Sequence, residues 1–123
     1  MEATEPLESL NVAILRGACS CPADVRELPS GQTLVQLQCT TRVGGKGVSV
    51  PVAVLDPPAW VESLGAGDEI LVVGPVRRRF FRASGATASR VEVAASVVAR
   101  ARDRRRAATT RRKIDALLEV LDG

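Results

Sequence analysis

Hydrophobic and polar residues alternate along most of this chain, which is the period of a β-strand with one covered face. The clearest case runs from Thr33 to Arg42, where Val35, Leu37 and Cys39 share one face and two glutamines lie on the other. That pattern predicts a strand whose polar side stays open and can receive a ligand. The same alternation predicts further strands at residues 11–21, 48–55, 69–82 and 90–98.

A helix is expected between the strands at residues 48–55 and 69–82. Asp56 is its expected N-cap, Pro57 lies in its first turn, and its end is expected near Gly65 or Gly67. Trp60 in this helix is interpreted as a core anchor in preference to a base-stacking residue. Three strands, a helix and two strands is the order of the OB-fold, a five-stranded Greek-key barrel that often binds oligonucleotides. We therefore expect an all-β domain of this type over residues 11–98.

The remaining segments have their own patterns. Residues 1–10 are expected to form a flexible acidic N-terminus, and residues 99–108 a basic linker. Thr109 or Thr110 can cap a following helix over residues 109–123. Such a short amphipathic helix needs its stripe buried, and packing on its own domain or on another copy is favoured over docking to a protein partner. The stripe has the spacing i, i+3, i+4, i+7 and consists of Ile114, Leu117, Leu118 and Leu121.

Charge is distributed unevenly along the chain. Residues 1–76 carry four basic and nine acidic side chains, whereas residues 77–123 carry thirteen basic and five acidic ones. A basic C-terminal half indicates a polyanionic partner. The strong preference for Arg over Lys favours bidentate phosphate contacts, although a GC-rich coding sequence would give the same preference.

The candidate site lies at residues 77–82, Arg-Arg-Arg-Phe-Phe-Arg, where the strand predicted at 69–82 becomes basic. On an extended strand Arg77, Arg79 and Phe81 share one face, while Val76 and Phe80 lie on the other, which we expect to face the core. Guanidinium groups beside an exposed aromatic ring can neutralise phosphates and stack an unpaired base. The alternative is a solvated edge whose charges prevent pairing with other chains.

Several residues, in this order and spacing, resemble the bacterial single-stranded DNA-binding protein family over roughly residues 11–98. They are Asn11, Leu15 and Gly17; Pro22, Arg26, Pro29 and Gly31; Leu64, Gly67, Asp68 and Ile70; Val73 and Gly74; Arg77, Arg79 and Phe81; and Val91, Glu92 and Val93. The resemblance implies an OB-fold that wraps single strands and assembles as a homotetramer or dimer.

Arg77 and Arg79 are similar to the family's basic strand positions, and Phe81 falls at a base-stacking position. The other stacking positions fall near Val43 or Gly44, at Ser49 and at Leu55, none of which is aromatic, and the family's acidic C-terminal tip is absent. We expect Arg contacts to carry more of the affinity than stacking does. Further candidates for DNA contact are Arg26, which can instead pair with Asp24 or Glu27, and Arg42 and Lys46, which can instead serve solubility.

Other classes of protein receive little support. Cys19, Cys21 and Cys39, without any His, make a poor metal site and are interpreted as small hydrophobic residues, so no cofactor is expected. The chain contains no constellation for acid–base or nucleophilic catalysis, and no apolar run near the ~20 residues of a membrane span. We expect a cytoplasmic, non-enzymatic accessory protein of DNA replication, recombination or repair. The alternatives are an OB-fold protein-interaction subunit with weak or no DNA binding, and an RNA-binding protein.

Overall fold

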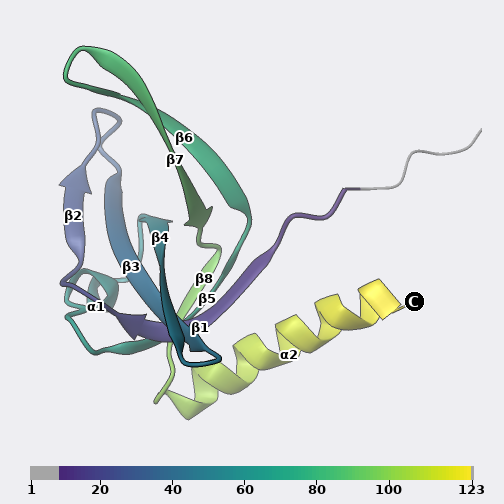
Figure 1. Cartoon of the computed structure of the whole chain (residues 1–123). Coiled ribbons are helices and arrows are strands. Elements are labelled where there is room, and N and C mark those ends of the chain that lie inside the picture. The colour runs from purple at the N-terminus through teal and green to yellow at the C-terminus, as the bar shows by residue number, and fades with distance from the viewer. Residues whose placement is uncertain (1–8, 123) are drawn as a thin grey trace, which may run out of the picture.

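The computed structural model describes residues 9–122, apart from the side chains at positions 104, 106, 107, 117, 118 and 120–122. The described chain consists mainly of β-strands with one short and one long helix, which confirms the all-β class (Figure 1). In chain order the elements are β1 (Ala13–Cys19), β2 (Asp24–Glu27), β3 (Thr33–Val43), β4 (Lys46–Leu55), α1 (Ala59–Glu62), β5 (Glu69–Gly74), β6 (Val76–Ala83), β7 (Ala86–Ala94), β8 (Val97–Arg100) and α2 (Arg104–Asp122).

The strands pair in the order β6-β7-β4-β3-β1-β5-β8, and β2 pairs with β3 beside this path. Neighbouring strands are antiparallel except β4 and β7, which pair in parallel where Val52 lies opposite Val93. This parallel pairing joins β4 to a strand about forty residues later along the chain, and so brings the hairpin of β6 and β7 beside β3 and β4.

The core lies on one face of these strands. Val35, Leu37 and Cys39 of β3 are at most 1% exposed, so the predicted buried face of this strand is confirmed. Because strands alternate their side chains, Gln36 and Gln38 lie on the opposite face. The largest cluster of buried residues is completed by Cys19, Val52, Val54, Val61, Leu64, Ile70, Val72 and Val93.

The strand expected over residues 69–82 is divided in two at Pro75, so the prediction of one continuous strand was wrong. Proline has no N–H to donate to a ladder. Its carbonyl still accepts a hydrogen bond from the backbone N–H of Ala94 at 2.8 Å. Gly74 passes so close to β7 that a Cβ there would collide with the Ala94 carbonyl. The chain therefore bends at residues 74–75, where a side chain has no room.

The second strand of the hairpin also differs from expectation. The turn between β6 and β7 contains only Ser84 and Gly85, both with positive φ (51° and 79°). The strand predicted at residues 90–98 begins earlier, at Ala86, and is divided into β7 and β8. A two-residue turn with both φ angles positive matches the twist of a hairpin, so the strands pair up to the turn.

Val76 and Phe80 were expected to face the core, and this prediction was wrong. They are 39% and 67% exposed, although they share a face with the buried Val93. For Phe80 the reason is the length of the β6–β7 hairpin, whose tip lies at the top of Figure 1, on the far side of the strands from α2. The outer part of the hairpin extends beyond the core, so no other described residues cover its core-side face there. Val76 lies at the base of the hairpin, opposite Val93, and that length does not explain its exposure.

The connection before β3 contains a strand that was not predicted, and the helix after β4 begins differently from the prediction. Residues Asp24–Glu27 form a short strand that pairs with β3, although all four are exposed and show no apolar alternation. Helix α1 has Pro58 at its N-cap position, without a side-chain cap. Asp56 has φ of 46° and instead accepts a hydrogen bond from the backbone N–H of Thr33 at 2.8 Å. It therefore fixes the end of β4 to the start of β3.

Trp60 of α1 is partly buried and packs against the core, as interpreted from the sequence. The guanidinium of Arg100 lies over its ring, 5.1 Å from the centroid. This cation–π contact ties the end of β8 to the helix.

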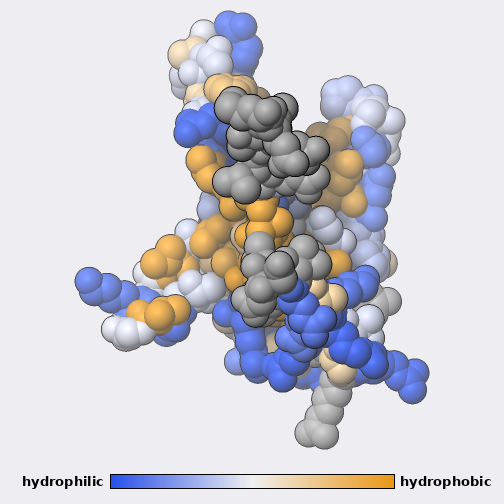
Figure 2. All heavy atoms as spheres, turned by 90° about the vertical axis from the view of Figure 1, so that its right-hand side faces the viewer, coloured by the Kyte–Doolittle hydropathy of each residue, from blue (hydrophilic) through white to orange (hydrophobic). Residues whose placement is uncertain are grey.

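Helix α2 begins at Arg104, five residues before the expected start, and β8 occupies part of the expected linker. The hydroxyl of Thr109 donates to the carbonyl of Arg105 inside the helix, so it is not a cap, and Thr110 is 4% exposed. Ile114 is partly buried and lines a pocket with Leu71. The side chains of Leu117, Leu118 and Leu121 lie outside the described residues. Figure 2 views the molecule from the side toward which the C-terminal end of α2 points, and hydrophilic side chains gather in the lower part of this view.

The three cysteines occupy different environments. Cys19 and Cys39 lie opposite one another on β1 and β3 and are buried, whereas Cys21 is exposed. Burial raises the pKa of the Cys19 thiol to about 11, helped by the neighbouring Cys39 and Asp68, and burial also raises the pKa of Cys39. Both buried thiols are therefore protonated and inert at neutral pH. No helix within the described residues is long and apolar enough to span a membrane.

Candidate nucleic-acid interface

The pairing of β6 with β7 places three of the predicted site residues on one face of the hairpin. Arg77 lies opposite Glu92 and Arg79 lies opposite Arg90, with Phe81 two residues further along β6. Glu92 precedes the core residue Val93, so this face points away from the core. We call it the arginine face.

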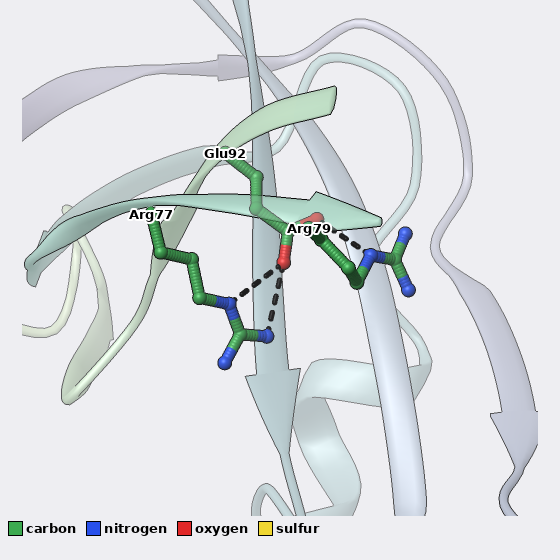
Figure 3. Close-up of polar contacts among 3 residues, drawn as sticks. All are labelled: Arg77, Arg79 and Glu92. Carbon is green, nitrogen blue, oxygen red and sulfur yellow. Dashed lines mark hydrogen bonds and ion pairs between the residues drawn. The ribbon is translucent and has the colours of Figure 1, made fainter. Parts of the chain in front are cut away.

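Glu92 organises the arginine face (Figure 3). Its side chain is 1% exposed, and its Oε2 accepts hydrogen bonds from Nε and Nη2 of Arg77 at 3.1 and 3.0 Å. Its Oε1 lies 3.2 Å from Nε of Arg79 in a second ion pair. A buried carboxylate requires such partners, because an unpaired one would lose its hydration without compensation. One carboxylate therefore holds two guanidinium groups side by side.

The polar contacts continue onto β3 and β2. The Gln36 amide can be oriented so that both its nitrogen and its oxygen have hydrogen-bond partners. In that orientation the nitrogen donates to Asp24 at 3.2 Å and the oxygen accepts from Nη2 of Arg79. Asp24 in turn pairs with Nε of Arg26 at 3.0 Å. The alternative that Arg26 pairs with Asp24 is thus observed. This pair is exposed on both sides, so it contributes little to stability.

Positive charge exceeds negative charge on the arginine face. Four arginines, at positions 26, 77, 79 and 90, meet two carboxylates, Asp24 and Glu92, which leaves a net charge of +2. Arg79 and Arg90 lie directly opposite, and like charges in that position repel. The Nε atoms of both are shielded from water and have no aligned hydrogen-bond acceptor among the described residues. An anion bound to the solvent-accessible parts of these side chains would relieve the repulsion.

Phe81 lies at the outer end of the arginine face. It is 40% exposed, and the guanidinium of Arg79 lies 6.0 Å from its ring centroid. An aromatic ring that is partly open and flanked by a cation can stack an unpaired base. Phe80 is more exposed, at 67%, but it lies on the other face of the hairpin.

Arg42 and Lys46 are not part of the arginine face. They lie at the end of the β3–β4 hairpin, where Arg42 pairs with Gly47 and Lys46 with Val43. Arg42 lines a separate groove together with Arg16 of β1. The structure thus brings together Arg26, Arg77, Arg79 and Phe81, and separates Arg42 and Lys46 from them.

The positions at which the family carries other stacking residues provide no aromatic ring. The Ser49 hydroxyl is hydrogen-bonded to that of Thr40 at 2.7 Å, while Leu55 and Val43 are 50% and 80% exposed. Phe81 is therefore the one ring of the arginine face among the described residues.

Sequence reasoning missed Glu92, Arg90 and Gln36 as members of this surface. Glu92 was detectable, because a lone acidic residue in the apolar run from Val91 to Ala94 needs a cationic partner once it is buried. Which residue would supply that partner depends on the hairpin register, and the sequence does not give the register until the two-residue turn at Ser84 is known.

No protein-family model matches this chain, and no match to a curated protein is found either. Within the described residues, no three His, Cys, Asp or Glu side chains gather as a metal site would require. The function of this chain is therefore inferred from the geometry of the arginine face.

Proposed function

We propose that this chain is an OB-fold protein that binds single-stranded DNA without sequence specificity, as an accessory protein of replication, recombination or repair. Strand pairing supports the fold. β5 and β6 are separated only by Pro75, so the path β6-β7-β4-β3-β1-β5 returns to its own beginning. The bond from Ala94 N–H to the Pro75 carbonyl extends the pairing of β6 with β7 as far as this junction, and closure of the path into a barrel is part of the proposal.

The arrangement around Glu92 carries the proposed function. It holds Arg77 and Arg79 next to Arg90, and the side chains of Arg77 and Arg79 remain 49% and 29% exposed. Phosphate oxygens can accept hydrogen bonds from the exposed parts of these planar guanidinium groups. Phe81, beside these groups, supplies a surface for one base. In this proposal the Arg side chains provide most of the affinity and stacking provides a smaller part. As the family resemblance implies, we also propose a homo-oligomer.

Binding is expected to be strongly salt-dependent. If two to four arginines of the arginine face each neutralise a phosphate, the slope of log K against log[salt] is about −1.4 to −2.8 for a single strand. Titration of an oligothymidine of about 35 nucleotides at several salt concentrations, followed by fluorescence anisotropy, measures it. Absence of binding at low salt would contradict the proposal, and so would an affinity that does not respond to salt.

Replacing Phe81 by Ala is expected to lower the affinity by about 1 to 3 kcal/mol, the contribution of one stacked base. The salt slope should stay unchanged, because no phosphate contact is removed. The matched control is Phe80→Ala, which deletes a more exposed ring from the other face of the same strand and should leave binding as it is. Equal losses in the two variants would contradict a stacking role for Phe81.

A protein-interaction subunit is the second candidate. It is favoured by the exposed apolar side chains on the core-side faces of the two long hairpins, namely Val43, Val48, Phe80 and Val91. Exposed apolar patches mark protein contacts. The oligothymidine titration separates the two candidates, since a subunit of this kind has little or no affinity for a single strand.

A further inference from the structure

A second basic groove lies on a different part of the molecule, where β1 and β3 separate. The two strands pair only at Ala18–Thr40 and Cys19–Cys39, after which β1 continues along β5 while β3 continues into its hairpin with β4. The resulting groove has a volume of about 500 Å³. Arg16 and Arg42 line it, together with Gly17, Thr40 and Glu69.

Glycine is required at the base of this groove. A Cβ at Gly17 would collide with the carbonyl of Thr40, because the backbones of β1 and β3 cross there at close range. Because no side chain can stand at Gly17, the groove has backbone at its base where another residue would collide with β3.

The arginines of this groove differ from those of the arginine face in their partners. Arg77 and Arg79 share Glu92, and Arg26 pairs with Asp24. Among the described residues, Arg16 and Arg42 form no ion pair, although Glu69 lines the same groove. Two cations therefore meet one carboxylate, and their guanidinium groups have hydrogen bonds available for a ligand.

The groove is continued by the C-terminal helix. Arg16 also lines a neighbouring pocket of about 270 Å³, whose other side is formed by Arg111, Ile114 and Asp115 of α2. Arg16 therefore connects Arg42 of the β3–β4 hairpin with Arg111 of the helix.

We propose that this basic groove, formed by Arg42, Arg16 and Arg111, binds the phosphate backbone of a second segment of the same single strand. The inference rests on the proposed function and extends it, since it assigns α2 a part in the DNA contact. Phosphates are the appropriate ligand because the groove offers guanidinium groups and backbone without an aromatic ring, which positions a strand and does not read its bases. A strand long enough to leave the arginine face would enter this groove.

The test compares Arg16→Ala/Arg42→Ala with Arg105→Ala/Arg112→Ala. The control pair is exposed on α2, lines neither pocket and removes the same charge. Oligothymidines of about 6 and about 30 nucleotides are used, the first within and the second beyond the roughly 4 to 16 nucleotides that one OB-fold occupies. We expect the groove variant to bind the long strand about fivefold more weakly and with a salt slope smaller by about 1.4, with the short strand unaffected. The control should match the unaltered protein on both strands.

The outcomes separate the two proposals. If the unaltered protein binds neither strand, the proposed function itself fails. If it binds both, and the groove variant has the same affinity and slope as the control, the basic groove is not a DNA site and the function stands. If light scattering shows that the groove variant changes its oligomeric mass while the nucleotides bound per chain stay constant, the groove is a contact between copies, which also overturns the inference. Thermal unfolding of each variant verifies that it is folded.

Discussion

The triple variant Arg77→Gln, Arg79→Gln, Glu92→Gln is expected to bind oligothymidine at least about tenfold more weakly at low salt, with a salt slope smaller by about 1.4. The two arginines are the guanidinium groups that Glu92 holds together on the arginine face. Glu92 is replaced at the same time because the carboxylate is buried and would otherwise be left without a partner. The variant thus removes two phosphate contacts and leaves no unpaired buried charge.

The matched control is Arg78→Gln/Arg82→Gln on the same strand. These side chains lie on the other face of the hairpin, where Arg78 donates to Ser89 and Arg82 to the carbonyl of Gly85. The control lowers the net charge by two, whereas the triple variant lowers it by one. If binding followed overall charge, the control would therefore lose more affinity. We expect it to lose less, and the opposite ranking would exclude the arginine face as the binding surface.

The fold was largely predictable where alternation and burial agree. β3 has apolar residues at every second position and a sharp boundary at each end, so its extent and buried face followed from the sequence. The errors concern chain direction. Pro75 and the close approach at Gly74 divide a strand that the apolar pattern continues through, because alternation records which face a residue takes and not where the backbone bends.

The short strand β2 and the exposure of Phe80 could not be predicted for a different reason. β2 is held by its backbone pairing with β3, and its four exposed side chains carry no apolar signal. Phe80 continues the core-side face of β6 but lies on a hairpin that extends beyond the core. Both depend on tertiary context, which a local pattern does not contain.

For the candidate site, the sequence indicated the cations and not their counter-charges. Arg77, Arg79 and Phe81 share a face, as alternation predicts, but their distance from Glu92 is fixed by the register of a hairpin with a two-residue turn. Arg42 was a further candidate for DNA contact because it flanks the glycine-rich hairpin connection, but the end of the β3–β4 hairpin places it in a separate groove.

Removing the arginines while keeping the carboxylate is expected to destabilise the protein. In Arg77→Ala/Arg79→Ala, Glu92 remains at a position that is 1% exposed and loses both cationic partners. Breaking a buried ion pair from one side costs about 3 to 5 kcal/mol. The lower value is expected here, because shortening two partly exposed side chains allows water to reach the carboxylate. Urea unfolding followed by circular dichroism measures the loss.

The same measurement on two further variants separates the ion pair from simple loss of side-chain contacts. Arg77→Ala/Arg79→Ala/Glu92→Gln should recover most of the lost free energy of unfolding, since a neutral amide tolerates that position better than an unpaired charge. Glu92→Gln alone should cost only about 1 kcal/mol, because the amide oxygen can still accept a hydrogen bond and the two arginines are partly exposed, at 49% and 29%. If the double variant unfolds at the same urea concentration as the unaltered protein, Glu92 is not held by these arginines. The arginine face would then lose its organising contact.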